Sequence, residues 1–274
     1  RYIDLDRRVL IVTDDGVPGE YANTVAAQCA APTVVCIPEG EASKNFESFR
    51  QLLYTMLCES FTRKDCVVAV GGGVVGDLSG FAASCYMRGI DFYNVPTTLL
   101  SQIDSSVGGK TAIDFENVKN VVGSFYQPKK VVIDPEVLET LDRRQLCSGL
   151  AEAIKMSLTS DAQLFELIEN SDDLSRDIDE IIIRSLKIKR DVVEKDPKET
   201  GLRRVLNFGH TIGHAIESLS HGALFHGECV ALGMIPMCSP AVRTRLIKVL
   251  KKYGLPFGIS QSADELMPLI LHDK

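Results

Sequence analysis

The sequence lacks several features that would place a chain in a special class of protein. No apolar run approaches the ~18 to 20 residues that a membrane-spanning helix needs, and no basic, apolar and small-residue leader opens the chain. Internal repeats and low-complexity tracts are also missing. We therefore expect a globular, cytoplasmic protein with no membrane partner.

Positively charged residues are fewer than negatively charged ones. The chain has 30 Lys and Arg against 37 Asp and Glu, which gives a formal net charge of −7. A chain without a basic excess does not offer a general nucleic-acid surface. A local cluster of Lys and Arg can still hold an anionic small molecule, because nearby charges outweigh distant ones.

The eight cysteines never form the C-x-x-C pair that is typical of redox and zinc sites. Most of them stand beside Ala, Val, Leu or Ile. We expect reduced thiols that are mostly buried, as in a cytoplasmic protein.

The first half of the 274-residue chain alternates β-branched runs with helical stretches. Strands are predicted at residues 8–14, 33–38, 65–73, 92–96 and 129–135, and helices at 45–59 and 77–87. Apolar strands that alternate with helices indicate a parallel sheet covered by helices. We expect an α/β domain of the Rossmann-like kind over residues 1–142.

The pattern changes near residues 141–144, and the second half has apolar residues at a period near 3.6. A mostly α-helical domain is predicted over residues 143–274, with a helix stop at Gly254 and Pro256. A cleft between two such domains is the usual place for a ligand.

A glycine-rich turn joins the strand at 65–73 to the following helix. Gly71, Gly73 and Gly76 form G-x-G-x-x-G between a strand and a helix, the context in which bare backbone N–H groups approach a pyrophosphate. It does not follow the first strand, so a standard Rossmann layout is not expected. Glycine turns that bind nothing are also common.

A second glycine motif is misleading. "DSSVGGKTAID" (104–114) resembles the end of a Walker A loop, but the first glycine of that motif would have to be residue 104, which is Asp104. No nucleotide triphosphatase is therefore inferred. Lys110 remains a good phosphate ligand on a mobile, glycine-flanked segment.

Four of the five histidines fall within residues 210–226. On one continuous helix, Arg203, Asn207, His210 and His214 would form a single polar stripe, since they are 4, 3 and 4 residues apart. Imidazoles at i and i+4 can share one metal ion, but a zincin would carry Glu at position 211, where Thr211 stands. A structural histidine pair is the alternative.

Metal sites usually include a carboxylate, and Glu152 is the best candidate. It lies in an apolar helical stretch with Lys155 one turn later. Buried acids are rare unless they are paired or bind a metal. An ordinary Glu–Lys pair within a helix is the other explanation.

Together these segments resemble 3-dehydroquinate synthase, an enzyme family of the shikimate pathway and aromatic amino acid biosynthesis. The resemblance runs from about residue 9 to the end and is carried by four long motifs, which are "GGGVVGDLSGFAASCYMRGIDFYNVPTTLLSQIDSSVGGKTAID" (71–114), "GLAEAIK" (149–155), "GLRRVLNFGHTIGHAIE" (201–217) and "FHGECVALGM" (225–234).

The resemblance implies an NAD-binding α/β domain, a helical metal domain, zinc or cobalt as the metal, and a homodimer. Members of the family convert 3-deoxy-D-arabino-heptulosonate 7-phosphate, a sugar-acid phosphate, into 3-dehydroquinate and phosphate. They do so by oxidation, phosphate elimination, reduction, ring opening and an aldol closure. The implied metal ligands are Glu152, His210 and His226, with His214 contacting substrate and His221 matching nothing.

The remaining positions are carried over by motif. The resemblance implies that catalytic and substrate-binding roles fall on Arg88, which would reach across the dimer, and on Asp104, Lys110, Asn120, Lys155, Lys189, Arg203, Asn207 and His214. It implies that NAD is bound by Asp14, Glu41, Lys44, Gly72, Gly73, Asp77, Thr97, Thr98, Lys119 and Thr140. The family pattern extends beyond Arg1 and beyond Lys274, so we expect the natural protein to be longer, and Lys274 itself to match a phosphate-binding lysine.

Three alternatives remain open at this point. Related cyclases that make 2-epi-5-epi-valiolone or 2-deoxy-scyllo-inosose act on substrates without the carboxylate. Metal-dependent polyol dehydrogenases of similar fold release NADH. A regulatory protein that binds metal and nucleotide would do no chemistry. Phosphate release without net NADH formation would favour a cyclase.

Overall fold

The computed structural model describes residues 3–116 and 118–271. The chain divides into two compact units, residues 1–141 and residues 142–274, and each is described by itself. His272 and Lys274 lie outside the described residues.

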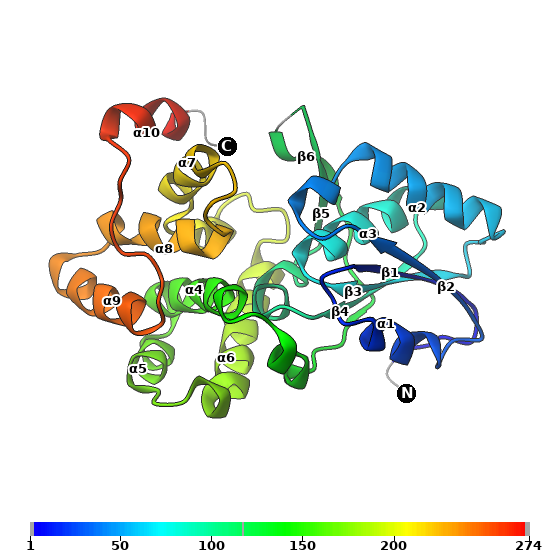
Figure 1. Ribbon diagram of the computed structural model, residues 1–274, viewed down its shortest axis with the longest axis horizontal. Helices are drawn as coiled ribbons and strands as arrows, with labels where there is room; N and C mark the ends of the chain where they lie inside the picture. The colour runs from blue at the N-terminus through cyan, green and yellow to red at the C-terminus, as the bar shows by residue number, and fades with distance from the viewer. Residues whose placement is uncertain (1–2, 117, 272–274) are drawn as a thin grey trace. The chain divides into compact units, whose positions relative to one another are not determined.

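The first unit is built on a parallel sheet of five strands in the order β2-β1-β3-β4-β7 (Figure 1). Every neighbouring pair in this sheet is parallel. The strands are β1 (Arg8–Asp14), β2 (Ala31–Ile37), β3 (Cys66–Gly71), β4 (Asp91–Pro96) and β7 (Lys130–Val131). The prediction of a parallel sheet covered by helices is therefore confirmed.

Helices cover both faces of this sheet. Leu10 and Val12 of β1 belong to the core beneath α2 (Phe46–Cys58) and α3 (Gly73–Cys85), whereas Val9 and Ile11 belong to the core beneath α1 (Gly19–Ala26). Successive residues of a strand point to opposite faces, and burial on both faces explains why the strands read as unbroken apolar runs.

Short helical turns and a hairpin complete this unit. The turns are η1 (Glu41–Ser43), η2 (Tyr86–Arg88), η3 (Ser101–Ser105) and η4 (Pro135–Thr140). An antiparallel pair, β5 (Lys110–Phe115) with β6 (Val118–Phe125), was not predicted. Lys110 was expected on a mobile segment, but it begins β5 and pairs with Phe125.

Three predicted elements of this unit have other boundaries in the structure. The strand predicted over 65–73 ends at Gly71, and α3 begins at Gly73 rather than near residue 77. The strand predicted over 129–135 has only two residues. In α3 a Cβ on Gly76 would lie 2.9 Å from Nδ2 of Asn94 on β4, so this glycine lets the helix lie close against the sheet.

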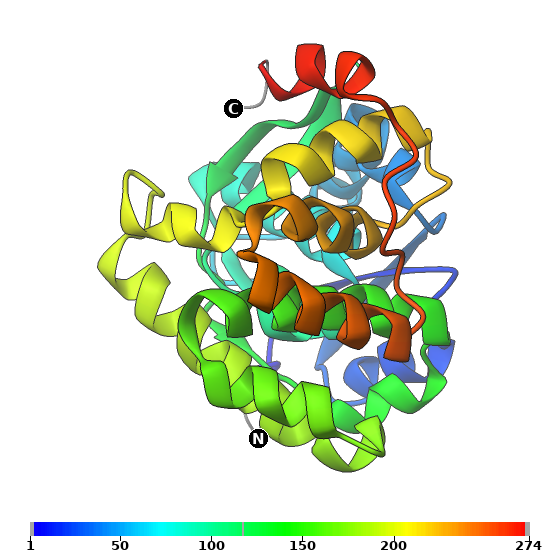
Figure 2. The same ribbon diagram turned by 90° about the vertical axis from the view of Figure 1, so that its left-hand side faces the viewer.

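The second unit is helical, as predicted (Figure 2). Its elements are α4 (Arg143–Ser160), α5 (Ala162–Asn170), α6 (Leu174–Lys195), η5 (Leu202–Asn207), α7 (His210–Ser220), α8 (His226–Met237), α9 (Pro240–Lys252) and α10 (Ala263–Ile270). The chain leaves α9 through Gly254, which has φ +72°, so the predicted stop is confirmed.

The expected polar stripe from Arg203 to His214 on one helix was wrong. A 3₁₀ turn carries Arg203 and Asn207, and α7 starts anew at His210. Gly209 separates them with φ +79°, a conformation that glycine adopts at little cost.

The remaining expectations concern cysteines and membranes. All eight cysteines are free, as expected, but only Cys66, Cys147, Cys229 and Cys238 are buried, so the prediction of mostly buried thiols was wrong. Within the described part of the chain, no helix has both the length and the apolar character needed to cross a bilayer.

Candidate metal centre and nucleotide-binding turn

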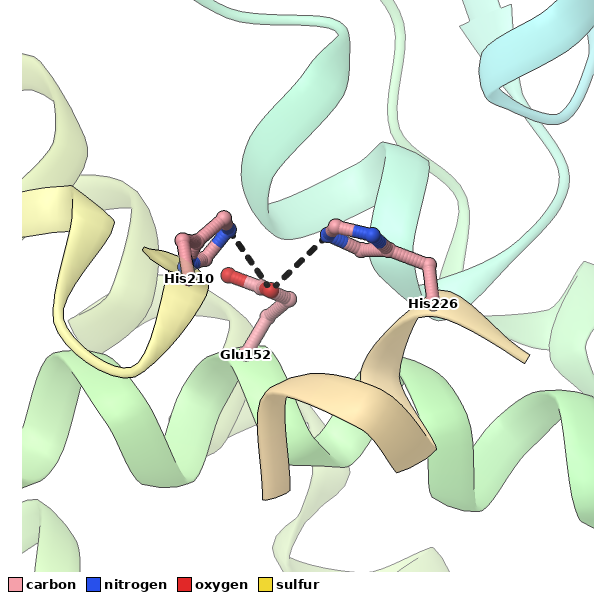
Figure 3. Close-up of side chains that lie close together, drawn as sticks. All are labelled: Glu152, His210 and His226. Atoms are coloured by element: carbon pink, nitrogen blue, oxygen red, sulfur yellow. Dashed lines mark ion pairs between the residues drawn. The ribbon is translucent and has the colours of Figure 1, made fainter. Parts of the chain in front are cut away.

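Three helices of the second unit bring one carboxylate and two imidazoles together (Figure 3). Glu152 lies in the middle of α4, and His210 and His226 are the first residues of α7 and α8. Nε2 of each histidine lies 3.6 Å from Oε1 of Glu152, and one ligand atom from each residue falls within 4.8 Å of the others. The distance of 3.6 Å is too long for a hydrogen bond. It is close to the roughly 3.3 Å that separates two ligands bound ~2 Å from one tetrahedral ion.

The two carboxylate oxygens of Glu152 have different surroundings. Oε2 pairs with Nζ of Lys155 on the same helix, and both side chains are 1 % exposed. Among the described residues, Oε1 is buried without a hydrogen-bond partner. Burial alone would raise the pKa of Glu152, but Lys155 and the two imidazoles outweigh it and hold that pKa well below its ordinary value. An ionised oxygen that faces two imidazole nitrogens is a metal-ligand arrangement.

The two histidines are held through their other ring nitrogens. Nδ1 of His210 lies 3.4 Å from the carbonyl oxygen of Phe208, whereas Nδ1 of His226 lies 2.9 Å from Oε2 of Glu217. Burial lowers the pKa of His210 to about 3. For His226 burial acts in the same direction, but Glu152 and Glu217 raise its pKa to about 10.

The sequence analysis missed Glu217. It stands seven residues after His210, two turns along α7 and on the same face. That spacing was the only signal, because its contact with His226 forms only when α7 packs against α8.

The position of His226 is set by the way α8 begins. A Cβ on Gly227 would lie 1.9 Å from the backbone oxygen of Ser148, so α8 lies directly against the backbone of α4. Glu228 accepts the backbone N–H of Phe225 and two hydrogen bonds, each of 2.7 Å, from the Arg144 guanidinium. These contacts fix the start of α8 to the helix that carries Glu152.

His214 lies beside the cluster. Its ring centroid is 5.3 Å from that of His210 and 5.9 Å from that of His226. His221 is the exposed residue that ends α7, with φ +47°.

Cationic side chains are buried in the same unit. Lys155, Lys189 and Arg203 have 1 %, 6 % and 1 % of their surface exposed, and α4, α6 and η5 pack together through Met156, Val192 and Leu206. Buried cations need anionic partners, and Lys155 has one in Glu152.

The segment before Arg203 is organised by Asp196. Its carboxylate accepts the backbone N–H groups of Thr200, Gly201 and Arg203, and these bonds lower the pKa of Asp196 to about 2. Arg203 donates to the carbonyl of Pro197 over 2.7 Å. Asn207 donates to Glu199 over 2.7 Å.

In the first unit, the predicted nucleotide residues Asp14 and Gly72 lie where the strand order reverses. The chain passes from β1 outward to β2 and later to β3 on the other side of β1, and ligands bind at such points, beyond the carboxyl ends of the strands. Asp14 ends β1 and Gly71 ends β3, followed by Gly72 as the N-cap of α3. Burial raises the pKa of Asp14.

Lys44 connects several of the predicted cofactor residues. Its Nζ lies 2.6 Å from Asp77 and 3.6 Å from Glu41, and it donates to Oδ1 of Asn120. Burial raises the pKa of Asp77 to about 6 despite Lys44. The structure thus joins a predicted NAD residue to a predicted substrate residue.

The other predicted positions of this unit lie on turns, except Lys119. Thr97 donates its N–H to the carbonyl of Gly71 over 3.0 Å, Thr98 bonds Ser101, and Thr140 bonds Tyr21. Asp104 lies in the π-helical turn η3, a conformation frequent at functional sites. Lys119 lies on β6.

Arg88 is exposed within a strained turn. Met87, Arg88 and Gly89 have φ of 49°, 70° and 116°, values that cost non-glycine residues energy and concentrate at functional sites. Two tyrosine hydroxyl groups hold this turn in place: Tyr86 donates a hydrogen bond to the carbonyl oxygen of Phe61, and Tyr126 donates one to that of Ile90.

Both units of the chain are similar in sequence to known proteins. A family model described as 3-dehydroquinate synthase N-terminal matches residues 34–148, and one described as 3-dehydroquinate synthase C-terminal matches residues 149–274. The 3-dehydroquinate synthase of Enterococcus faecalis (strain ATCC 47077 / OG1RF) is 46 % identical over 287 residues, which cover 98 % of this chain and 80 % of that protein.

Two solved structures of cyclases superpose closely on this chain. The 2-epi-5-epi-valiolone synthase of Streptomyces hygroscopicus subsp. jinggangensis 5008, solved with NAD⁺ and Zn²⁺, superposes with a TM-score of 0.90 at 30 % identity, covering 97 % of this chain and 80 % of that one. A 2-deoxy-scyllo-inosose synthase with carbaglucose-6-phosphate, NAD⁺ and Co²⁺ gives 0.87 at 27 %, covering 100 % and 80 %.

The chain thus has the fold of the sugar-phosphate cyclases, two of which superpose on 97 % and 100 % of its length. Within this class, the 46 % identity to a 3-dehydroquinate synthase and the two family models point to one family. The chain belongs to the 3-dehydroquinate synthase family.

Proposed function

We propose that this chain converts 3-deoxy-D-arabino-heptulosonate 7-phosphate into 3-dehydroquinate and phosphate, with NAD and one divalent metal ion as cofactors. The observation that carries the proposal is Oε1 of Glu152, which is buried without a hydrogen-bond donor among the described residues and faces two imidazole nitrogens at 3.6 Å each. Family membership supplies the substrate.

The metal is held by Glu152, His210 and His226. Three protein ligands leave a position open for substrate oxygens, as catalytic zinc sites require. When bound, the ion polarises the hydroxyl and carbonyl oxygens of the substrate as a Lewis acid. Zn²⁺ and Co²⁺ both suit this set of ligands, and both occur in the related cyclase structures.

NAD binds at the turn between β3 and α3. Gly72 and Gly73 leave this turn without side chains, and neither position has room for one: a Cβ on Gly72 would lie 3.1 Å from the Thr98 side chain, and a Cβ on Gly73 would lie 3.2 Å from Oγ of Ser105. The first N–H groups of α3 have no partner within the helix and are available to the pyrophosphate. Bound NAD supplies the hydride acceptor and donor.

Other residues of the chain hold the substrate. Arg203, with Lys189 nearby, binds the carboxylate, because a guanidinium and a carboxylate form two parallel hydrogen bonds. Arg88, Lys110, Asn120 and His214 bind the phosphate. Asp104, Lys155 and Asn207 contact the reacting oxygens. The protein acts as a homodimer, with Arg88 contributed to the partner.

The best alternative is a related cyclase that acts on a substrate without a carboxylate, since such enzymes share the fold. Phosphate release separates the two functions. The chain is assayed with NAD and Zn²⁺ on heptulosonate phosphate and, in parallel, on sedoheptulose 7-phosphate, which lacks the carboxylate. We expect phosphate release from the first substrate without net NADH. Faster turnover of the second substrate would replace this proposal by the cyclase function, and net NADH formation would favour a dehydrogenase.

A further inference from the structure

The contact between Glu217 and His226 joins two helices at the metal cluster. Oε2 of Glu217 on α7 lies 2.9 Å from Nδ1 of His226 on α8, and the Glu217 side chain is 15 % exposed. None of the motif-based assignments gives Glu217 a role. We propose that Glu217 is a positioning residue for the metal ion: it orients the His226 ring and keeps the proton on Nδ1.

The direction of this contact carries the argument. A carboxylate at Nδ1 makes that nitrogen the hydrogen-bond donor, which leaves the lone pair of Nε2 for a metal. Nε2 is the nitrogen that faces Oε1 of Glu152 at 3.6 Å. Glu217 therefore selects the tautomer and the ring orientation that the cluster needs.

His210 provides an internal comparison. Its Nδ1 faces a backbone carbonyl 3.4 Å away, that of Phe208, which no side-chain substitution can remove. The ring of His226 is instead oriented by a side chain, that of Glu217. The turn before His226 contains two consecutive residues in the left-handed region, His221 (φ +47°) and Gly222 (φ +85°). The imidazole of His226 thus has an orienting partner that can be removed.

The test measures metal affinity of the full chain, stripped of metal, by competition with a chromogenic zinc chelator. Glu217→Ala is expected to weaken zinc binding by ~10 to 100-fold, and to change the visible absorption of the Co²⁺-loaded protein. Glu217→Gln retains an acceptor of the same size and is expected to lose less. Glu180→Ala removes a carboxylate that pairs with Arg184 on α6 and is the matched control, with unchanged affinity.

Other outcomes have distinct meanings. A zinc affinity of Glu217→Ala within twofold of the unsubstituted chain overturns the inference, as does a change in metal-free Tm with no change in affinity. Should Glu217→Ala fail to fold, Glu217→Leu, which fills similar space without a hydrogen-bond acceptor, decides by the same criterion.

The inference rests on the proposed function, because it presupposes a metal at Glu152, His210 and His226. Glu152→Gln separates the two. Undiminished zinc binding by Glu152→Gln would overturn the metal site itself. Loss of zinc in Glu152→Gln, with retention in Glu217→Ala, would overturn only the role of Glu217.

Discussion

The two units build their sites from different parts of the chain. In the α/β unit, the candidate nucleotide site is centred on backbone, a glycine turn and the first turn of α3 at the ends of β1 and β3, with the Lys44–Asp77 ion pair as part of its side chains. In the helical unit, the candidate site consists of buried side chains, a carboxylate with imidazoles and cations. A site made of backbone is damaged by adding atoms, whereas a site made of side chains is damaged by removing them.

The largest expected effect of removal concerns Arg203. Arg203→Met deletes a bidentate partner for the substrate carboxylate, and we expect kcat/KM for heptulosonate phosphate to fall by a factor on the order of 10³. The loss with sedoheptulose 7-phosphate should be far smaller. Arg204→Met, at the exposed neighbouring position, is the control. Equal losses on both substrates would mean that Arg203 serves the fold, through its bond to Pro197.

Removal of a metal ligand should have the next largest effect. His226→Ala is expected to weaken zinc binding on the order of 10²-fold or more, because each ligand contributes about 3 kcal/mol. His214→Ala should retain one zinc per chain, measured by metal analysis after dialysis. The reverse result, with zinc lost from His214→Ala and kept by His226→Ala, would favour the His210–His214 pair.

In the α/β unit, an added side chain should weaken NAD binding. Gly73→Val places a branched side chain where even a Cβ alone would lie 3.2 Å from Oγ of Ser105. We expect NAD affinity to fall on the order of 10²-fold, since the pyrophosphate loses its close approach. Zinc stoichiometry should not change. Gly19→Val, where a Cβ meets nothing within 4 Å, is the control for NAD binding measured by calorimetry. Normal NAD affinity in a folded Gly73→Val protein would contradict the placement.

The smallest effect is a dependence on pH. In the metal-free protein at pH 7 to 8, His226 carries a proton because its pKa is about 10, while His210 is neutral because its pKa is about 3. Metal binding must therefore displace one proton, and affinity should rise up to ~tenfold per pH unit over this range. Calorimetry in two buffers of different ionisation enthalpy counts the proton. No release would mean that His226 is not a ligand.

Burial explains which strands could be predicted from the sequence and which could not. The strands β1 and β3 are covered on both faces, so their residues form apolar runs that could be recognised directly. The β5–β6 hairpin was missed for the opposite reason. Most of β6 is exposed, and the strand contains Gly123, whose Cβ would lie 2.2 Å from the carbonyl oxygen of Thr111. A mostly exposed segment with Lys, Asn and Ser and an internal glycine reads in the sequence as a loop.

The candidate metal site was also predicted only in part from the sequence. The apolar surroundings of Glu152 in the sequence indicated a buried acid, and its burial is confirmed. The 4-3-4 spacing favoured one helix through His210, yet the backbone turns at Gly209. The contact between Glu217 and His226 depends on how two helices pack, which no local pattern contains.

The close backbone contacts also determine which positions tolerate change. Gly227 lies against the backbone of Ser148, and Gly233 against the backbone of Gly209. Neither glycine carries a group that binds metal, cofactor or substrate. In a survey of all single substitutions these two positions should nevertheless accept as few alternatives as Glu152, and at Gly227 even alanine should be rejected. Sites that tolerate no replacement in this protein therefore include positions that do no chemistry, and tolerance alone would not separate them from the ligands.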